Sequence, residues 1–494
     1  MESPVFLPDP DSPASPSAPP LVVDLDGTLI RGDLAMEAMI VVARRGLGSL
    51  LALLAMLLRG RGALKTWLAR VAPVDPARLA YRPQVLARIT QARAQGRPVW
   101  LATAAHRRNA LRVAAHVGLF DAVLASDHRH NLKGPRKLAA IGAQAGGQPF
   151  DYLGDSPADR PIWQAARCAL TVGVASHCAH EQRLGPAPRR LRALARAARP
   201  HQWAKNALVF VPLASSGLLT QPAELARSLL AFACLSLIAS GVYLINDLLD
   251  IEADRLHPRK ASRPLAAGEL SVPQALIAAL GSTVLGLGMA LALLPPAAFV
   301  AMVAYCALTL AYSLRLKAAM IADVLTLACL YTLRIIAGAL ALEVPVSSWL
   351  LLFSVFFFLS LGYLKRYVEL LGSPRATHEL LSGRGYVPAD ADIVAPSGIA
   401  AGMVAILVLV LFAEAMGRTG TYASPEWLWL LPLPLLYWLN RIWMMARRGQ
   451  VDSDPVAFAI TDTRSLAVGA IMAGLLLVAK FAHVPVHLLA LVKP

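Results

Sequence analysis

Apolar residues follow two different spacings along the chain, and the change comes near residue 200. In residues 20–184, short apolar runs alternate with stretches of helical periodicity such as Pro83–Ala94 and Arg107–Val117. The apolar runs, where we predict buried parallel strands, are Leu21–Leu25, Val99–Ala102, Ala122–Ala125 and Tyr152–Gly154. This alternation predicts a doubly wound α/β domain with a small helical cap. Residues 1–19, rich in Pro, Ser and Asp, are expected to be a disordered lead.

The apolar stretches in residues 206–494 are long enough for helices to cross a membrane. We predict an all-α polytopic bundle of about nine helices, with spans near residues 206–219, 226–245, 273–292, 296–314, 321–341, 347–364, 396–416, 425–445 and 465–485. The first span is short against the roughly 20 residues that a crossing helix needs. Residues 185–205 form a basic linker, which can fold as an amphipathic helix on a negatively charged membrane face.

Composition and charge support a membrane protein. Hydrophobic residues make up 56% of the chain, its mean hydropathy is +0.54, and its formal net charge is +16. The basic residues lie between apolar segments, so we expect membrane contact and no nucleic acid. One set of loops is basic. By the positive-inside rule, we expect these loops and the N-terminal domain to lie on the cytoplasmic side of a bacterial-type inner membrane. Its cations are Arg255, Arg259, Lys260, Arg263, Arg315, Lys317, Lys365, Arg366, Arg375, Arg384, Arg441, Arg447 and Arg448.

A further apolar run, residues 47–58 (LGSLLALLAMLL), lies inside the first domain. It is too short to span a bilayer. We favour a buried helix of the cap. The alternative is a cap helix that dips into the bilayer interface.

Candidate chemistry in the first domain begins at the end of its first strand. Asp24 and Asp26 stand two residues apart before Gly27, so both face the crevice where α/β sheets bind ligands. One carboxylate can attack phosphorus while the other moves a proton, with Mg²⁺ offsetting the negative charges. Later positions suit the same substrate: the Thr103 hydroxyl and the Lys137 ammonium for phosphate, and Asp155 and Asp159 for the metal ion.

In this order, these four motifs resemble those of the haloacid dehalogenase superfamily of phosphatases. The resemblance implies Asp24 as nucleophile and Asp26 as general acid and base. It implies Mg²⁺ held by Asp24, the backbone carbonyl of Asp26 and Asp155, with Asp159 in support. Lys133 is an alternative to Lys137. A domain with no activity, kept for folding or membrane docking, is the other interpretation.

A second group of acids ends the second long apolar span. Asp247, Asp250 and Asp254 are spaced to share one helix face, with Asn246 beside them. Carboxylates at the end of a membrane helix are costly unless they face a wet cavity or bind cations. Oxygen ligands of this kind favour Mg²⁺ that bridges to a diphosphate. The interpretation without function is a solvated acidic loop.

This motif, with Arg263-Pro264-Leu265-Ala266-Ala267-Gly268 after it, resembles the first aspartate-rich motif of UbiA prenyltransferases. The resemblance continues in residues 199–206, Tyr312–Lys317, Asp323 and Tyr331–Gly338. It implies catalytic roles for Asp247 and Asp250, and Mg²⁺ held by the set Asn246, Asp247, Asp250 and Asp254.

One segment departs from the pattern of that family. Where a second aspartate-rich motif is expected, Gly362–Leu370 carries Lys365 and Arg366. The chain is therefore more similar to the branch of decaprenyl-phosphate phosphoribosyltransferases, whose donor is phosphoribosyl diphosphate and whose acceptor is a polyprenyl phosphate. Such anionic substrates need cations. The candidates are Lys205, Arg263, Arg334, Lys365 and Arg366; topology anchoring is the alternative for Lys365 and Arg366.

Together the two sites lead to one hypothesis. The membrane domain makes polyprenyl-phosphoryl-5-phosphoribose, and the fused domain removes the 5-phosphate in an arabinan cell-wall precursor pathway. Three alternatives stay open: prenylation of an aromatic acceptor from a polyprenyl diphosphate, a phosphatase for an unrelated soluble phosphate, and a lipid-phosphate carrier or scaffold without catalysis. A homo-oligomer is compatible with all of them.

Overall fold

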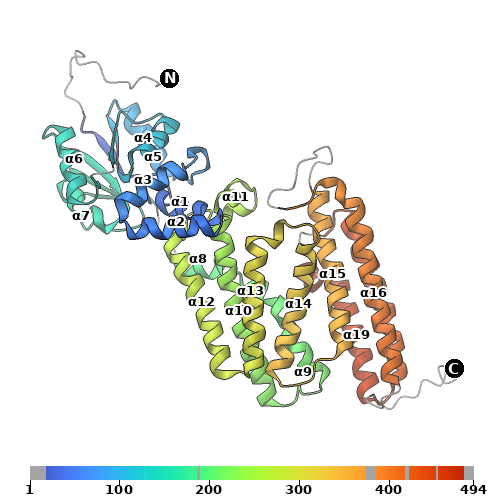
Figure 1. Ribbon diagram of the computed structural model, residues 1–494. Coiled ribbons are helices and arrows are strands. Elements are labelled where there is room, and N and C mark those ends of the chain that lie inside the picture. Colours follow the sequence, from blue (N-terminus) through green and yellow to red (C-terminus); the bar gives the residue numbers. More distant parts are fainter. Residues whose placement is uncertain are drawn as a thin grey trace. The chain divides into compact units, whose positions relative to one another are not determined.

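The computed structural model describes residues 18–127, 130–185, 190–372, 384–417, 422–451 and 454–482. The expected disordered lead lies outside these residues as far as residue 17, as do Arg375 among the loop cations and residues 186–189 of the linker. The chain forms two compact units (Figure 1). The N-terminal unit comprises Met1–Ala198 and Leu244–Ala278, and the helical unit comprises Arg199–Tyr243 and Ala279–Pro494.

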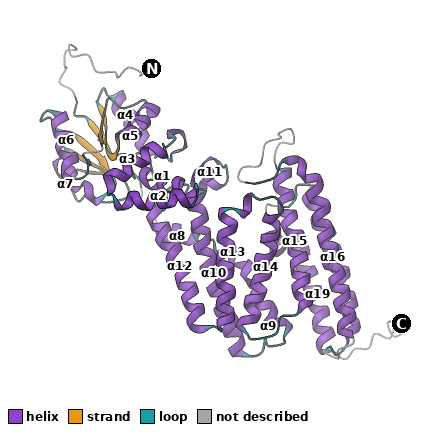
Figure 2. Ribbon diagram, in the orientation of Figure 1, coloured by secondary structure: helices purple, strands orange, loops and turns teal. Residues whose placement is uncertain are grey.

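The N-terminal unit is built on a six-stranded parallel sheet with the order β3-β2-β1-β4-β5-β6 (Figure 2). The strands are β1 (Leu21–Val23), β2 (Val99–His106), β3 (Ala122–Ser126), β4 (Asp151–Gly154), β5 (Cys168–Thr171) and β6 (Glu181–Arg183). The chain runs outward from β1 on one side and returns to β4 on the other. The carboxyl ends of β1 and β4 therefore flank the point where the strand order reverses, which is where such sheets bind ligands.

Helices connect the strands as the apolar pattern predicts. They are α4 (Pro83–Ala94), α5 (Arg107–Val117), α6 (Pro135–Ala145) and α7 (Arg160–Ala165), with short 3-10 turns η1 (Pro76–Arg78) and η2 (Pro157–Asp159). The strands β1, β2 and β4 are almost wholly buried, because apolar side chains cover both faces of the sheet. The doubly wound α/β fold is confirmed. The strands β5 and β6 were not predicted.

Three helices between β1 and β2 form the cap: α1 (Leu34–Arg44), α2 (Leu47–Leu58) and α3 (Arg61–Val71). They share a small apolar core that includes Val42, Leu53 and Leu68. The favoured interpretation of residues 47–58 was correct about a cap helix and wrong about burial. Leu51 and Leu58 are 58% and 91% exposed, because the cap is too thin to cover both faces of α2.

The N-terminal unit also contains the segment that joins two long helices. It includes the end of α10 (Pro222–Leu249), α11 (Ile251–Leu256), η4 (Lys260–Ser262) and the start of α12 (Val272–Leu293). The linker helix α8 (Arg190–Ala197) belongs to the same unit, and its Arg196 pairs with Glu269 at 2.9 Å. This unit therefore carries the aspartate-rich motif as well as the α/β domain.

Seven helices of the described chain are long and apolar enough to cross a membrane. They are α10, α12, α13 (Pro296–Leu314), α14 (Ala322–Ala341), α15 (Ser348–Leu371), Pro388–Gly417, which joins η6 (Pro388–Asp390) to α16 (Ala391–Gly417), and α19 (Thr463–Phe481). The two other predicted spans are shorter. Residues 206–219 fold as η3 (Pro200–Phe210) and α9 (Val211–Ser215), and residues 425–445 as η7 (Pro425–Leu430) and the 16-residue α17 (Pro432–Arg447).

Buried side chains of the helical unit gather into two main cores. One includes Ile238, Met302 and Ala337, and the other includes Leu364, Ile442 and Ala446. The short elements η5 (Leu316–Ala318) and α18 (Pro455–Thr461) complete this unit. Its long apolar helices define a multi-pass membrane protein.

Candidate functional sites

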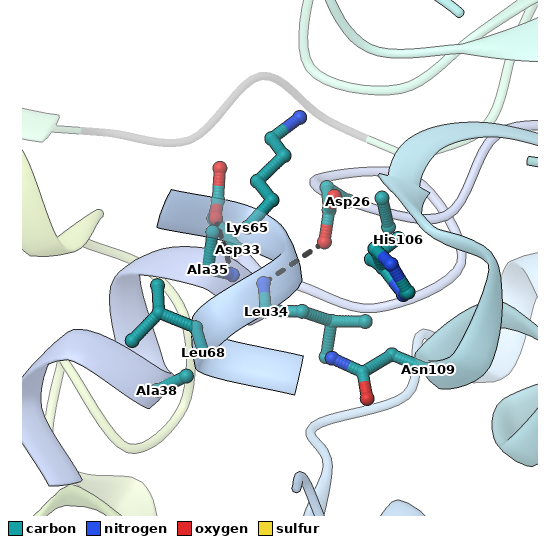
Figure 3. A pocket seen from close by; sticks show the side chains of 10 residues that line it. Asp26, Asp33, Leu34, Ala35, Ala38, Lys65, Leu68, His106 and Asn109 are labelled. Atoms are coloured by element: carbon teal, nitrogen blue, oxygen red, sulfur yellow. Dashed lines mark hydrogen bonds between the residues drawn. The ribbon is translucent and has the colours of Figure 1, made fainter. Parts of the chain in front are cut away.

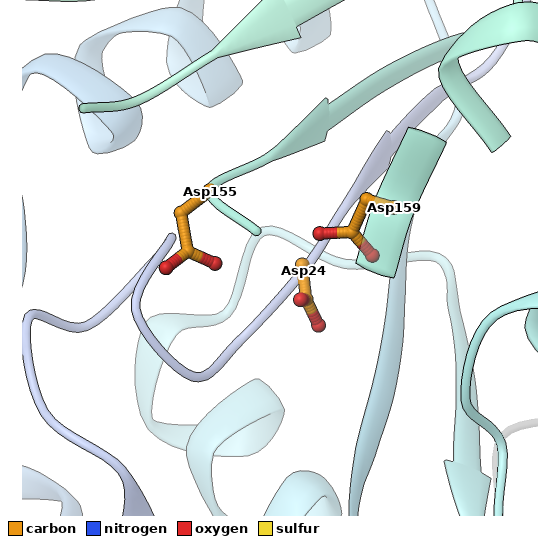
Figure 4. A group of neighbouring side chains, drawn as sticks. All are labelled: Asp24, Asp155 and Asp159. Atoms are coloured by element: carbon orange, nitrogen blue, oxygen red, sulfur yellow. The ribbon is translucent and has the colours of Figure 1, made fainter. Parts of the chain in front are cut away.

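Three carboxylates converge at the reversal point of the sheet. Asp24 follows β1 directly, Asp155 follows β4, and Asp159 lies one turn further on at the end of η2 (Figure 4). One oxygen from each lies within 4.8 Å of the others. Hard oxygen ligands so close together fit Mg²⁺, and a divalent ion would relieve the repulsion among the three negative charges. Three of the four predicted metal ligands thus lie together, and their role stays a prediction.

One lysine partly neutralises this group. The Lys137 ammonium lies 3.1 Å from Asp24 Oδ1 and 3.3 Å from Asp159 Oδ1, and donates to the Tyr152 hydroxyl at 2.9 Å. The lysine reaches them from the first turn of α6, where Gly134 precedes it with a positive φ. The alternative, Lys133, is exposed. The Tyr152 hydroxyl also donates to Asp159 at 3.0 Å. No signal in the sequence indicates this contact, because Tyr152 lies inside the apolar run of β4.

Burial shifts the pKa values of two of these acids, Asp155 and Asp24. It raises the pKa of Asp155 to about 7, with further repulsion from Asp24 and Asp159. Burial also raises the pKa of Asp24, although Lys137 opposes the shift. A cation bound beside these two groups would oppose the shifts, because it stabilises the ionised carboxylates.

Asp26 has different surroundings from the other acids. Its Oδ1 accepts from the backbone N–H of Leu34 at the start of α1, at 2.9 Å. It lines a pocket between the sheet and the cap together with Lys65, His106 and Asn109 (Figure 3). Burial, and then the nearby Asp33, raise the pKa of Asp26 well above its usual range. A raised pKa suits a carboxyl group that serves as a general acid.

Two small residues shape the same site. Gly27 has a φ of +77°, and a Cβ built there would lie 2.1 Å from Asp155 Oδ2, so only glycine leaves that carboxylate its place. Thr103 is fully buried in β2, and its Oγ1 accepts from the Ala105 N–H at 2.9 Å. The hydroxyl of Thr103 remains a candidate for a phosphate oxygen.

The aspartate-rich motif has its own cation. Arg263 Nη1 lies 3.2 Å from Asp247 Oδ1 and 2.6 Å from Asp254 Oδ2, so both acids face one point. Asp250 lies at the junction between α10 and α11, where its φ and ψ leave the helical region. Asn246 and Asp250 are half-buried. Arg263, which we predicted to bind phosphate, here bridges the carboxylates of Asp247 and Asp254.

A buried arginine defines the second cluster, in the helical unit. Arg334 on α14 is 5% exposed and donates to Asn206 Oδ1 at 2.9 Å, to the Tyr305 hydroxyl at 2.8 Å and to the Leu330 carbonyl at 2.6 Å. Its guanidinium also lies 4.7 Å from the ring centre of Tyr305 and 5.3 Å from that of Tyr331. All these partners are neutral. Among the described residues, no carboxylate pairs with Arg334.

Two lysines of this cluster share one acid. Lys205 pairs with Asp454, which also interacts with Lys365. Burial alone would raise the pKa of Asp454, but Lys205 and Lys365 outweigh it and lower that pKa. Asp454 caps α18 by accepting from the Ala457 N–H at 3.3 Å.

Arg366 has a different environment from its neighbour Lys365. Its side chain is fully buried and pairs with Asp323 and Glu369. The Tyr386 hydroxyl donates to Asp323 at 2.7 Å and its ring lies 5.5 Å from the guanidinium. Two carboxylates already balance Arg366, so its surroundings favour a structural role over the phosphate-binding one that we expected.

The long apolar helices and the acidic motif at the end of α10 define a membrane-embedded transferase with a hydrolase-like α/β domain in front. Residues 208–460, more than half of the chain, match the UbiA prenyltransferase family, and residues 21–164 match haloacid dehalogenase-like hydrolases. The chain therefore belongs to the UbiA prenyltransferase family and carries a haloacid dehalogenase-like domain. Both predicted resemblances are confirmed.

Three similar proteins illustrate these matches. Protein y4nM of Sinorhizobium fredii is 39% identical over 466 residues, which cover 92% of this chain and 90% of that protein. A decaprenyl-phosphate phosphoribosyltransferase of Mycobacterium tuberculosis is 42% identical over 179 residues, covering 35% of this chain and 59% of that protein. The solved structure of a UbiA homolog from Archaeoglobus fulgidus bound to GPP and Mg²⁺ aligns with a TM-score of 0.44 at 20% identity, over 57% of this chain and 97% of that one.

Proposed function

We propose that the membrane domain transfers 5-phosphoribose from phosphoribosyl diphosphate to a polyprenyl phosphate. The observation that carries the proposal is the positive charge of the second cluster. Arg334 is buried without a carboxylate partner among the described residues, and Lys205 and Lys365 share Asp454. A buried cation without a counter-ion is costly, so the cluster gains free energy when a phosphate group binds. The similarity to decaprenyl-phosphate phosphoribosyltransferases supports this substrate class.

The acids at the end of α10 and in α11 suit the donor's diphosphate. Asp247 and Asp254 would hold Mg²⁺, with Asp250 and Asn246 beside them, and the ion would make diphosphate a better leaving group. In the transfer, the bond from ribose C1 to the diphosphate oxygen breaks and a bond from C1 to an oxygen of the lipid phosphate forms. Arg263 is placed to hold either the acids or the released diphosphate.

The α/β domain would then remove the 5-phosphate of that product. An Asp24 oxygen attacks phosphorus, and Asp26 gives its proton to the departing ribose oxygen. Water then cleaves the aspartyl phosphate while Asp26 takes the proton back. Lys137 favours the ionised form of Asp24, and Mg²⁺ on Asp24, Asp155 and Asp159 would balance the phosphate charge. The raised pKa of Asp26, which burial and then the nearby Asp33 cause, supports this role.

Purified full-length protein in lipid nanodiscs tests the scheme. With phosphoribosyl diphosphate, Mg²⁺ and decaprenyl phosphate, we expect decaprenyl-phosphoryl-ribose by mass spectrometry. The Asp24→Asn variant should accumulate the 5-phosphorylated lipid at an unchanged rate of diphosphate release. Identical products from both proteins would refute the sequential scheme. Product formed only from a polyprenyl diphosphate and an aromatic acceptor would refute the transfer itself.

A further inference from the structure

The cap helix α2 has an apolar face that the rest of the protein leaves uncovered. Leu53 is 6% exposed and packs on α1 and α3, whereas the opposite face is open to solvent. The open leucines are Leu50, Leu51, Leu54, Leu57 and Leu58, which are 38%, 58%, 49%, 47% and 91% exposed. A run of five exposed leucines on one short helix is unusual for a soluble surface and marks an interaction site.

The charges around α2 are all positive. Between Ala38 and Val74 the chain contains no Asp or Glu, and α2 itself has no charged residue. The cations of this segment are Arg44, Arg45, Arg59, Arg61, Lys65 and Arg70. Arg44, Arg45 and Arg59 flank the two ends of α2 and are exposed. An apolar face framed by arginines is complementary to a bilayer surface with anionic headgroups.

Contacts inside the N-terminal unit tie the cap to the end of a membrane helix. The Arg255 guanidinium donates to both carboxylate oxygens of Glu37, each at 2.8 Å. Glu37 is in the first turn of α1, which packs on α2, and Arg255 is in α11, six residues after α10 ends. Both side chains are less than 10% exposed. The cap is thus attached to a segment that begins where a membrane span stops.

A second contact reinforces this attachment. Arg31, just before α1, donates to the Ala267 carbonyl at 2.7 Å, and the Arg31 side chain lies against Gly268. A Cβ at Gly268 would lie 2.2 Å from Arg31 Cβ, so the two segments are in close contact. Cap and loop are therefore joined at two points.

We propose that the open face of α2 lies in the lipid headgroup layer of the bilayer that this chain spans, on the side where α10 ends. At 12 residues, α2 is about 18 Å long, which suits a helix parallel to the surface and not one that crosses. The leucines enter the interface and the flanking arginines contact anionic headgroups. This docking holds the cap at the level of lipid phosphates, and it does not depend on which reaction the α/β domain catalyses.

Photo-crosslinking in the full-length protein tests the proposal. p-Benzoyl-phenylalanine replaces Leu54, or replaces Leu111 as a matched control: Leu111 is 45% exposed on α5, outside the cap. In nanodiscs of phosphatidylcholine with phosphatidylglycerol, we expect about fivefold more lipid adduct at position 54 than at position 111. Without phosphatidylglycerol, the adduct at position 54 should decrease. Equal yields at the two positions, or crosslinks from position 54 to a second copy of the chain, would overturn the proposal.

A second variant examines the docking without a probe at the surface. Leu51→Ser with Leu58→Ser changes only exposed side chains, so folding should be retained. We expect hydrogen exchange of α2 amides in nanodiscs to become severalfold faster than in the wild type, and the two proteins to exchange alike in detergent. No difference between the proteins in nanodiscs would contradict docking.

Discussion

The two clusters that we propose to bind phosphate groups have opposite charge balance. In the N-terminal unit three acids, Asp24, Asp155 and Asp159, lie close together; Lys137 pairs with Asp24 and Asp159, and Arg82 interacts with Asp155. In the helical unit the cations are in excess, since Lys205 and Lys365 share one aspartate, Asp454, and Arg334 has none among the residues described. The first cluster therefore has an excess of negative charge, and the second has an excess of positive charge.

The same side chain responds in opposite ways in the two units. Burial raises the pKa of Asp155 to about 7, and the like charges of Asp24 and Asp159 add to the shift. Burial acts in the same direction on Asp454, but the two lysines lower its pKa below the usual value. Burial alone therefore does not decide the state of a carboxyl group; its neighbours do. Under the proposed function, a phosphate would approach the first cluster together with a metal ion, and it would bind the cations of the second cluster directly.

The largest effect is expected from Arg334→Met. If a phosphate is the missing anion, this change removes a charged donor worth about 3–4 kcal/mol, and transfer should decrease by about 10²–10³-fold. Hydrolysis of a soluble phosphomonoester by the same preparation should be unchanged. Diphosphate release measures the first reaction and phosphate release the second.

Arg227→Met is the control, because Arg227 is a half-exposed arginine near the start of α10. It should transfer at the wild-type rate. Near-normal transfer by Arg334→Met would show that the arginine has only a structural function, and the contrast between the clusters would no longer hold.

A single methyl group should disturb the acidic cluster. Gly27→Ala places a Cβ where Asp155 Oδ2 lies and at a positive φ, so Asp155 must move. We expect phosphatase activity to decrease by about 10–100-fold, with a higher Mg²⁺ requirement and unchanged transfer. Gly96→Ala is the control, since Gly96 also has a positive φ but open space around it. Equal losses in both variants would assign the effect to backbone strain alone.

The sequence predicts the first site better than the second, for a physical reason. Asp24, Asp155 and Asp159 follow strand ends, and parallel strands bring their carboxyl ends to one edge, so adjacency follows from topology. The fold class and the helices α4 and α5 follow from periodicity in the same way. Arg334, Tyr305 and Asp454 come from separate helices, whose packing no local pattern determines. Arg366 illustrates this limit. It follows Lys365 in the sequence, but the helix directs its side chain toward Asp323.

The acidic cluster, unlike the cationic one, should bind Mg²⁺ with an affinity that depends on pH. The pKa of Asp155 is near 7 without a metal ion, so below that pH the carboxyl group must lose a proton to become a ligand. The affinity of the α/β domain for Mg²⁺ should therefore decrease by up to about tenfold per pH unit below pH 7, and it should be constant above pH 7. Without Mg²⁺, the raised pKa means that the folded state binds more protons between about pH 4 and 7, so stability decreases as pH rises through that window.

Phosphatase activity titrated with Mg²⁺ between pH 5.5 and 8.5 gives this profile (about three pH units around the pKa of Asp155). Asp155→Asn should lose the pH dependence along with most of the affinity. A flat profile in the wild type would mean that the acidic cluster is already ionised and that its surplus of negative charge is balanced elsewhere.

The smallest effect concerns the contact between the cap and the aspartate-rich loop. Glu37→Gln removes the charge that Arg255 meets, leaving a buried guanidinium with a neutral partner. We expect α11 and the first turn of α1 to exchange amide hydrogens several times faster, and transfer to decrease about two- to fivefold, because Asp254 is adjacent to Arg255. Arg255→Met should give a similar result. In the double variant the losses should not add, since each change removes the same interaction. Additive losses would mean that Glu37 and Arg255 act separately, and that the α/β domain and the acidic motif are neighbours without being coupled.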